Sequence, residues 1–479
     1  MSQSKVINSF IWKFLERAST QIINLIIQVV LTRLIIPEDF GALALLIVFV
    51  NIASIFVQKG FSSSLIRKKE VTEEDSNTVF TVSILISTIL YSVLFLTAPS
   101  IAEIYSLPIL TSSLRIISVQ LFFGSVYCVQ NALLIRKMSF KAIFIRGFIS
   151  TIISGSVGIT MALQGYGLWA LVIQSLLNQV LLCTTAWFAV QWRPRFFFSK
   201  HSFYSVFSFG GKIVLSELLS YGVESVRTLL IGGRYSEEML SFYDRGQIYP
   251  ATLMRGIYDT VSGVLLPHFS KEQDRGDALA KDVIVSISLT MFLVMPVFLG
   301  MAAVAPILIR LLLTEKWMGA VPYFVLFSIY QIPYPIQGIC RQAIYARGKS
   351  GYVLKMEIIK ASLALITLLI ALPFGVMAIA VSALVTMYAT TLISLMFGKR
   401  IVSFRFVDIG KKMWKTTFAS VVMYVVVVAE NMLEISPISL LVTQVFTGAA
   451  VYIMASFVLK NENLQYLMNA IRKKEMGGK

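Results

Sequence analysis

Ionisable and amide side chains recur at helical spacing inside apolar stretches of this sequence. Arg17, Gln21, Asn24 and Gln28 are three or four residues apart, so they share one face of the helix that the surrounding apolar stretch predicts. An ionised side chain near the centre of a bilayer costs about 2.5 to 3.5 kcal/mol, so such residues persist where they face water, protein or an opposite charge. Guanidinium groups in a partly desolvated cleft bind phosphate oxygens strongly.

Two further segments carry polar faces of the same kind. The first contains Glu217, Ser220, Tyr221, Glu224 and Thr228, with Arg227 at its margin, and the second contains Arg245, Tyr249, Thr252, Arg255 and Asp259. Arg255 and Asp259 are four residues apart, which is the spacing of an ion pair on a helix. We expect the three faces to line one hydrophilic cleft. The alternative for single residues is snorkelling, because Glu16 and Arg17 lie about two turns from a helix end.

The stretch YQIPYPIQGICRQ, at residues 330–342, predicts a broken helix. Pro333 and Pro335 free backbone groups that only a cavity or a protein neighbour can satisfy. Tyr334, Gln337 and Arg341 share a face in this stretch. Aromatic rings beside amide and guanidinium donors suit a sugar, whose C–H faces stack on rings while its hydroxyl groups form hydrogen bonds. A packing kink with tyrosines at the membrane interface is the alternative.

The elements that position these residues are predicted to be membrane-spanning helices. Apolar residues make up 57% of the 479 and charged residues 14%, which leaves too few polar side chains to cover a soluble globular protein. The apolar runs have the length, about 20 residues, that a helix needs to cross a bilayer, and they lack the alternation of a membrane barrel. We predict an all-α polytopic membrane protein of about 14 spans, near residues 8–35, 41–60, 78–98, 112–135, 142–163, 167–190, 206–232, 240–267, 283–311, 320–345, 353–373, 376–397, 414–431 and 437–458.

Lysine and arginine are concentrated in alternate connections between these spans. Connections after even-numbered spans carry them, as at Arg67, Lys68 and Lys69, whereas LQGYGL (163–168) and LPFGVM (372–377) have none. By the positive-inside rule both termini are cytoplasmic. The net charge of +17 therefore reflects membrane topology, and we expect no nucleic-acid partner.

Catalytic and metal-binding arrangements are not indicated. No connection exceeds about 20 residues, which leaves no room for a soluble catalytic domain, and no GxxxxGK[ST] motif occurs. We therefore predict that the chain is not an enzyme and holds no cofactor or metal. Cys128, Cys183 and Cys340 occur singly in apolar stretches and are expected to be small buried hydrophobic residues. The only two histidines, His201 and His268, lie far apart.

The two halves of the chain resemble each other. SFIWK (9–13) followed by PEDF (37–40) recurs at one constant offset as SFGGK (208–212) followed by SEEM (236–239). We predict two six-helix bundles in the same orientation, at residues 1–200 and 201–398, followed by two accessory helices and a basic cytoplasmic tail at 399–479. Transporters use parallel repeats of this kind to build a central site between the halves.

This layout resembles the bacterial polysaccharide flippases of the multidrug/oligosaccharidyl-lipid/polysaccharide (MOP) exporter superfamily. The segment LTRLIIPEDFGALALL (31–46), with Pro37, Phe40 and Gly41, is similar to the oligosaccharide flippases and to the colanic-acid or teichuronic-acid exporters. The resemblance covers most of the chain. It implies a protein of the bacterial plasma (inner) membrane that moves undecaprenyl-pyrophosphate-linked oligosaccharide repeat units from the inner to the outer leaflet, by alternating access, for surface polysaccharide biosynthesis.

The resemblance also implies roles for the polar faces. Family members place cations in the central cleft, and the positions that could fill this role are Arg17, Arg227, Arg245 and Arg255. The second span departs from the family pattern, because it has no cation before Lys59. The acidic residues Glu16, Glu217, Glu224 and Asp259 would either hold the arginines when the site is empty or take up a coupling Na⁺ or H⁺. Expected partners are the lipid-linked oligosaccharide, the lipid bilayer, a polysaccharide polymerase and glycosyltransferases.

Three other functions are weighed against this one. A cation-coupled multidrug exporter of the same superfamily would prefer an apolar or aromatic cavity with one acidic ion site. A polytopic polysaccharide polymerase or ligase would need a large external loop with catalytic residues. A scaffold without transport activity would not account for the number of charges placed in the membrane. Several arginines on the predicted cleft faces favour the flippase.

Overall fold

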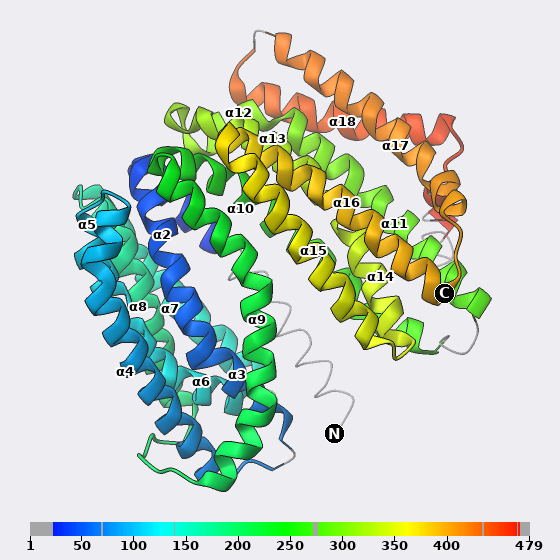
Figure 1. Cartoon of the computed structure of the whole chain (residues 1–479). Coiled ribbons are helices and arrows are strands. Elements are labelled where there is room, and N and C mark those ends of the chain that lie inside the picture. Colours follow the sequence, from blue (N-terminus) through cyan, green and yellow to red (C-terminus); the bar gives the residue numbers. More distant parts are fainter. Residues whose placement is uncertain are drawn as a thin grey trace. The chain divides into compact units, whose positions relative to one another are not determined.

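The computed structural model describes residues 23–68, 70–137, 139–271, 276–433, 435–466 and 468–469. Within these ranges all regular secondary structure is helical, which confirms the predicted all-α class (Figure 1). The chain forms two compact units, Met1–Ser241 and Phe242–Lys479. The predicted boundary near residue 200 divides the chain by sequence repeat rather than by contacts, and it stays a prediction. Glu16, Arg17 and Gln21 lie outside the described residues.

The first unit contains the helices of the first predicted repeat and, in addition, α9, the first helix of the second. A short apolar helix at Ile23–Leu34 precedes the labelled elements. These are α2 (Pro37–Ser54), the π-helical segment η1 (Ile55–Lys59), α3 (Gly60–Arg67), α4 (Glu73–Ile104), α5 (Ile109–Ile117), α6 (Gln120–Arg136), α7 (Phe140–Leu163), α8 (Leu168–Ala189) and α9 (Lys200–Arg234). Because α2, η1 and α3 run on without a break, they make one apolar helical span.

The second unit begins within α10 (Glu237–Lys271). It continues with α11 (Gly276–Ala303), α12 (Ala305–Leu313), η2 (Glu315–Ala320), α13 (Val321–Gln331), α14 (Tyr334–Ala346), α15 (Ser350–Ala371), η3 (Leu372–Phe374), α16 (Val376–Val402), α17 (Phe406–Ala429), η4 (Glu430–Met432) and α18 (Pro437–Val458). The break between α13 and α14 falls at Pro333, as the sequence predicts.

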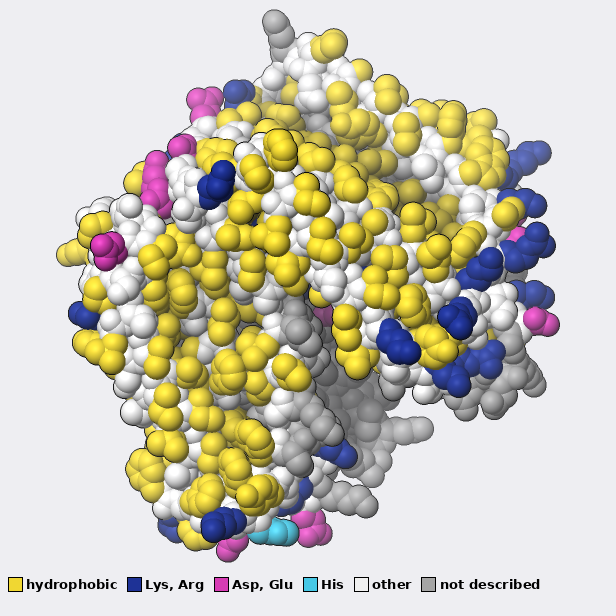
Figure 2. All heavy atoms as spheres, in the orientation of Figure 1, with side chains coloured by type: hydrophobic (Ala, Val, Ile, Leu, Met, Phe, Trp, Pro, Cys, Tyr) yellow, Lys and Arg dark blue, Asp and Glu magenta, His cyan; other side chains and the backbone are white. Residues whose placement is uncertain are grey.

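Ten segments of the described chain are long and apolar enough to cross a membrane. The protein is therefore a multi-pass membrane protein, and the number 14 stays a prediction. The two 35-residue helices α9 and α10 are not among the ten, although about 52 Å of helix exceeds the thickness of a hydrocarbon layer. They carry two of the three predicted polar faces. Figure 2 shows hydrophobic side chains over most of the visible face of the molecule. Lysines and arginines gather where α16 ends and α17 begins.

One proline lies inside the third helix of the first repeat. Pro99 has no N–H, so the carbonyl of Phe95, four residues earlier in α4, loses its helical hydrogen-bond donor. Arg115 of α5 supplies a replacement, because its Nε donates to Phe95 O at 3.1 Å and its guanidinium lies 4.1 Å from the centre of the Phe95 ring. The freed carbonyl is thus satisfied from a neighbouring helix.

The second repeat has a proline at the matching place. Pro296 of α11 lies 197 residues after Pro99, close to the offset between SFIWK and SFGGK. It frees the carbonyl of Phe292, and Tyr452 of α18 donates its hydroxyl to that oxygen at 2.7 Å. Both halves therefore lose one helical hydrogen bond to a proline. They differ in the side chain that donates to the freed carbonyl, which is Arg115 in the first half and Tyr452 in the second.

Glycines make a second structural match between the halves. Gly167 precedes α8 with φ +50°, and Gly375 precedes α16 with φ +103°, a region of backbone space that favours glycine. These turns lie in the cation-free connections LQGYGL (163–168) and LPFGVM (372–377). The repeated proline and the repeated glycine turn add to the evidence for an internal repeat, and the parallel orientation of the two repeats stays a prediction.

Helix α11 lies between two cores of the second unit. One face, with Ile287, Met291, Val294 and Phe298, packs into a buried cluster that includes residues of α10 and α14. The other, through Phe292 and neighbouring residues, packs against the accessory helices α17 and α18. Apolar residues on both faces account for its near-continuous apolar sequence.

Helix α9 packs against α2, α3 and α4 of the first unit. Its crossing with α3 is very close, since a Cβ atom added to Gly60 would lie 2.6 Å from the carbonyl oxygen of Gly210. Nearby, Ser64 of α3 donates its hydroxyl to the carbonyl of Val206 at 2.9 Å. Small residues let the two backbones approach, and van der Waals packing then holds them.

Candidate functional site

The first predicted polar face is described only in part. Asn24 is exposed and Gln28 is half-buried on the helix Ile23–Leu34. Arg17, Gln21 and the acidic Glu16 are outside the described residues, so the role of this face as a ligand site stays a prediction.

The polar face on α9 meets a polar residue of α2. Asn51 donates its side-chain amide to the hydroxyl of Tyr221 at 3.0 Å. One turn further on, Arg227 Nη1 lies 3.4 Å from Glu224 Oε1, with the arginine side chain 7% exposed and the carboxylate 48% exposed. Glu217, on the same helix, is exposed. The α9 face is therefore a mixed polar surface whose arginine is buried and whose carboxylates reach outward.

The polar face on α10 is divided between buried and exposed groups. Arg245 is buried, with 4% of the residue exposed. Arg255 and Asp259 are exposed, and Arg255 Nε donates to the carbonyl of Ala251 on its own helix at 3.4 Å. Arg255 and Asp259 are thus the members of this face that a ligand reaches most directly.

Two of the three predicted residues of α14 join a larger cluster. The rings of Tyr258 (α10) and Tyr334 (α14) meet edge to face with their centres 5.2 Å apart. Arg341 Nη2 lies 3.5 Å from the Tyr258 hydroxyl, and Arg341 Nη1 lies 3.9 Å from Glu357 Oε1 on α15. Lys360 Nζ approaches the same carboxylate oxygen at 3.3 Å. We call Tyr258, Tyr334, Arg341, Glu357 and Lys360 the cation cluster.

The cation cluster carries two positive charges and one negative charge. Charge-assisted N–H···O bonds are usually about 2.7 to 2.9 Å long, so contacts of 3.3 and 3.9 Å are loose. The Glu357 side chain is 43% exposed and that of Arg341 is 34% exposed, so water and a ligand both reach them. An incoming anion could replace Glu357 beside the two cations, while the tyrosine rings offer faces and edges for a sugar.

The third predicted residue, Gln337, is engaged inside the second unit. Its amide nitrogen donates to the hydroxyls of Thr390 and Thr391 on α16 at 3.1 and 2.9 Å. These hydrogen bonds join α14 to α16. The role of Gln337 as a sugar ligand stays a prediction.

Sequence reasoning missed three members of the cluster. Tyr258 occupies a buried position one residue before Asp259, and a Cβ atom added to Gly338 would lie 2.1 Å from its ring, so glycine makes room for this tyrosine. Glu357 and Lys360 lie in the predicted span 353–373. Together with Lys355 they place three charged residues in the first turns of this span, and that was the available signal.

A further buried cation was also missed. Arg146 of α7 is 3% exposed, and its Nη2 donates to the side-chain oxygen of Asn131 on α6 at 2.9 Å. Its guanidinium lies 5.1 Å from the centre of the Tyr127 ring. These contacts lie between helices of the first unit, which indicates a structural role for Arg146.

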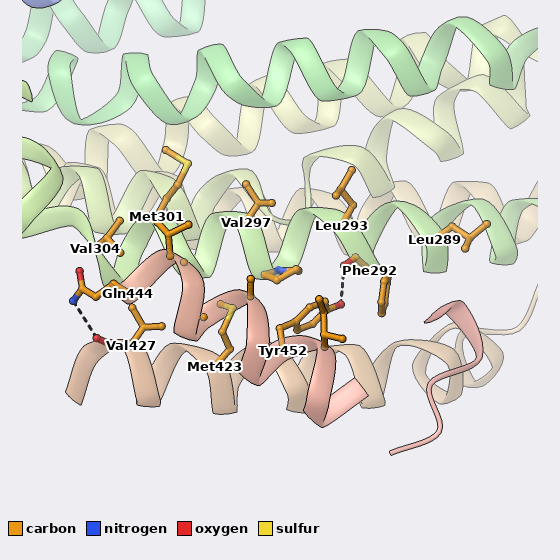
Figure 3. Close-up of a pocket in the computed structure, with 16 residues that line it drawn as sticks. Leu289, Phe292, Leu293, Val297, Met301, Val304, Met423, Val427, Gln444 and Tyr452 are labelled. Atoms are coloured by element: carbon orange, nitrogen blue, oxygen red, sulfur yellow. Dashed lines mark hydrogen bonds between the residues drawn. The ribbon is translucent and has the colours of Figure 1, made fainter. Parts of the chain in front are cut away.

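An apolar groove of about 670 Å³ lies between α11, α17 and α18 (Figure 3). Pockets that bind small molecules in proteins are about 300 to 1,000 Å³, so the groove falls within that range. Its α11 wall includes Leu289, Leu293 and Val297, and Met423 of α17 and Ile453 of α18 face them. The lining is almost entirely hydrocarbon.

Hydrogen bonds fasten the groove at both ends. Tyr452 donates to the carbonyl of Phe292, and Gln444 donates to the carbonyl of Val427 at 3.2 Å (Figure 3). Gln444 also donates to the side-chain oxygen of Asn431 at 3.0 Å. The few polar groups in the walls are thus used to join the helices. Such a groove suits a hydrocarbon chain and offers little to a charged group.

The three cysteines are buried and free of disulfides, as predicted. Within the described ranges, no group of three or more His, Cys, Asp or Glu side chains is placed to hold a metal ion. Besides the polar faces of α9 and α10, the described residues therefore offer a polar, cationic cluster and an apolar groove, both in the second unit.

Comparisons with known proteins identify similar sequences and folds. Residues 30–322 match the family model described as "Polysaccharide biosynthesis protein". The succinoglycan biosynthesis transport protein ExoT of Rhizobium meliloti is 22% identical over 318 residues, which are 66% of this chain and 64% of that protein. This chain therefore spans just under two thirds of the length of that relative.

Solved structures share the fold across most of the chain. The lipid II flippase MurJ, in an inward closed conformation, matches with a TM-score of 0.76 at 16% identity, over 94% of this chain and 98% of that one. An inward-facing multidrug resistance MATE family transporter of the MOP superfamily matches with a TM-score of 0.63 at 14% identity, over 80% and 94%. The solved proteins that share this fold are thus a flippase and a transporter.

Proposed function

Because this chain belongs to the polysaccharide biosynthesis protein family and has the fold of MOP superfamily transporters, we propose that it is a flippase for lipid-linked oligosaccharides. The observation that carries the proposal is the cation cluster. Arg341 and Lys360 share the partly exposed carboxylate of Glu357. The rings of Tyr258 and Tyr334 lie beside them, on helices α10 and α14 of the second unit. An anionic, glycosylated headgroup has the matching chemistry.

The cation cluster would bind the headgroup. Pyrophosphate oxygens would take the place of Glu357 beside Arg341 and Lys360, because guanidinium and ammonium groups bind phosphate more strongly where water is partly excluded. Tyr334 would stack against the first sugar. Arg255 and Asp259, exposed on α10, and Arg227 and Glu224 of the first unit would contact the headgroup at other stages.

The apolar groove would hold part of the lipid tail. Each buried CH₂ group contributes about 0.8 kcal/mol relative to water, but a tail already dissolved in the bilayer gains much less, so the groove would guide the tail rather than supply the affinity. A groove on the accessory helices keeps the tail in an apolar environment while the headgroup crosses.

The remaining features of the mechanism follow from the proposed substrate. The lipid would be undecaprenyl pyrophosphate, moved from the inner to the outer leaflet of a bacterial inner membrane by alternating access between the two repeats. Both termini would lie in the cytoplasm. Glu224, Glu217 or Asp259 would be the carboxylates that take up Na⁺ or H⁺ if transport is coupled. Glycosyltransferase partners would supply the substrate, and a polysaccharide polymerase would consume the product.

A reconstituted transport assay tests the proposal. Purified protein in liposomes should increase the access of an external enzyme or reagent to a labelled prenyl-pyrophosphate oligosaccharide loaded on the inner leaflet. Arg341→Gln should slow this transfer, and Lys349→Gln, an exposed cation beyond the end of α14, should not. Equal rates with empty liposomes would contradict the flippase assignment. Deleting the gene should in parallel remove one surface polymer.

The second candidate is a multidrug exporter of the same fold. The observation in its favour is the almost wholly apolar groove, which would accept a hydrophobic drug. The same liposomes distinguish the two, because an exporter would move a cationic dye and leave the lipid-linked oligosaccharide in place.

A further inference from the structure

Aromatic side chains are exposed on the segment that joins α8 to α9. Figure 1 shows the course of this segment. Residues 190–199 form no regular helix, and α9 begins at Lys200. Phe196 is 78% exposed, Phe198 is 51% exposed and Tyr204 is 70% exposed. We call residues 190–204 the aromatic linker. Phe197 is 45% exposed, so four large rings are exposed within nine residues, which indicates a partner that covers them.

The aromatic linker follows the first turns of α4. Trp192 donates its indole N–H to the side chain of Asn77 at 3.0 Å, and the backbone N–H of Phe197 donates to the hydroxyl of Thr81 at 3.0 Å. Thr81 lies four residues beyond Asn77, which is about 6 Å further along the helix. The backbone N–H of Ser199 then returns to Thr78 at 3.1 Å. The linker therefore runs along α4 from Asn77 to Thr81, where Phe197 is bound, and then turns back to Thr78.

Hydrogen bonds within the protein let this irregular segment lie at a membrane boundary. Arg193 Nη1 donates to the carbonyls of Val190 and Trp192 at 2.6 and 3.0 Å, so it satisfies the backbone where α8 ends. Beneath the linker, the buried ring of Phe80 holds the rings of Trp192 and Phe196, with centres 6.1 and 5.4 Å away. Irregular backbone is tolerated near lipid only when its polar groups are paired in this way.

The charge of the aromatic linker has one sign. The sequence from Trp187 to Ser216 contains no Asp or Glu, and Arg193, Arg195 and Lys200 lie within the linker itself. Arg195 and Lys200 are exposed. Acidic residues of the neighbouring α4 terminus are Glu73 and Glu74, which are exposed, and Asp75, which bonds Lys68 at 2.7 Å.

We propose that the aromatic linker is a docking site for anionic phospholipid on the membrane surface at this end of α4. Phe196, Phe198 and Tyr204 would insert at the level of the headgroups and glycerol, and Arg195 and Lys200 would bind the phosphates. A lipid fits better than a soluble partner because the exposed rings continue onto Phe188 of α8, itself 92% exposed on a candidate membrane span. The proposal is independent of the transported substrate.

A local fluorescence probe tests this directly. The three native cysteines are buried, so they can be replaced and a single cysteine placed at Phe196 to carry an environment-sensitive dye. In nanodiscs of phosphatidylcholine with a rising share of phosphatidylglycerol, the dye emission should shift to the blue and be quenched by brominated lipid. Emission characteristic of water at every lipid composition would overturn the proposal and would indicate a soluble partner for this surface.

Charge variants test the specificity for anionic lipid. Each cation near an anionic membrane contributes about a fivefold factor in binding, so Arg195→Gln with Lys200→Gln should raise the phosphatidylglycerol fraction needed for the shift. The matched control, Arg400→Gln with Lys411→Gln, removes two exposed cations, one from the last turn of α16 and one from α17, and should leave the transition unchanged. The proposal fails if both pairs behave alike, or if the shift is complete without phosphatidylglycerol. The dye measurement alone decides the matter should the linker variants not accumulate.

Discussion

Tyr452 donates its hydroxyl to the carbonyl oxygen of Phe292 at 2.7 Å, and this is the carbonyl that Pro296 deprives of its helical donor. In a membrane no water is available to satisfy such a group, so the bond fixes where α18 meets α11. The accessory helix α18 is thus held to α11 through the carbonyl that Pro296 frees, and α11 is a helix of the second repeat. The same contact closes one end of the apolar groove.

A double-mutant cycle should reveal this dependence. Tyr452→Phe leaves the Phe292 carbonyl unpaired and should lower the free energy of unfolding by about 0.6 to 1.7 kcal/mol, as for hydrogen bonds between membrane helices. In a Pro296→Ala background the backbone N–H returns, so Tyr452→Phe should cost much less. The measurement is denaturation in mild detergent. Equal costs in the two backgrounds would show that the hydroxyl is not serving the freed carbonyl.

Removing the carboxylate of the cation cluster should trap an anionic ligand. In Glu357→Gln the two cations Arg341 and Lys360 lose their internal competitor, so a prenyl-pyrophosphate oligosaccharide should bind more tightly and be released more slowly. Binding and turnover are measured on the same reconstituted sample. Glu462→Gln is the control. Glu462 does not belong to the cluster, and its Oε2 lies 3.8 Å from Lys412 Nζ. Weaker binding in Glu357→Gln would count against the exchange of anions.

Filling the groove should slow transport without unfolding the protein. A Cβ atom added to Gly300 meets only Met423 at 3.8 Å, an ordinary contact, so Gly300→Leu should fit and occupy groove volume. Because the groove guides the tail rather than supplying the affinity, displacing about two CH₂ groups of the tail, at about 0.8 kcal/mol each at most, should slow transport by up to about fifteenfold and change lipid affinity little. Gly410→Leu, with open space around Gly410, is the control. An unchanged transport rate in Gly300→Leu would show that the tail does not use this groove.

Thiol labelling should separate the two ends of the α10 face. A cysteine at the exposed Arg255 should react quickly with a charged maleimide, and one at the buried Arg245 should react slowly. The background is low because the native cysteines are buried. The labels are counted by intact mass. Similar rates at the two positions would mean that α10 does not present one buried and one exposed arginine.

The overall architecture follows from sequence because it depends on repeated, strongly periodic signals. Long apolar runs predicted the helices, and Pro333 predicted the break between α13 and α14. The repeat was visible in short motifs, and Pro99 with Pro296 adds a match that the motifs did not include. Contacts are harder to foresee. That α9 packs on α2, α3 and α4 depends on how glycine-lined surfaces fit together, which no periodicity expresses.

The candidate site could be predicted only in part, for a physical reason. A helical face shows which residues point the same way, as for Tyr334 and Arg341, but it does not identify their partners on other helices. Glu357 and Tyr258 come from α15 and α10, and only the packing brings them to Arg341. The groove has no polar signature at all, because its lining looks like any other lipid-facing surface in the sequence.

The close crossing of Gly60 and Gly210 has a consequence for biosynthesis. Domains generally fold as the chain emerges from the ribosome, beginning with the N-terminal one. Here the surface of α3 around Gly60 is covered only after α9 has been translated, so the first unit cannot finish folding when its own repeat has been made. The preceding helices must wait in the translocation machinery or the bilayer with that surface unprotected, and a ribosome that stalls between α8 and α9 would leave a fragment suited to removal by quality-control proteases.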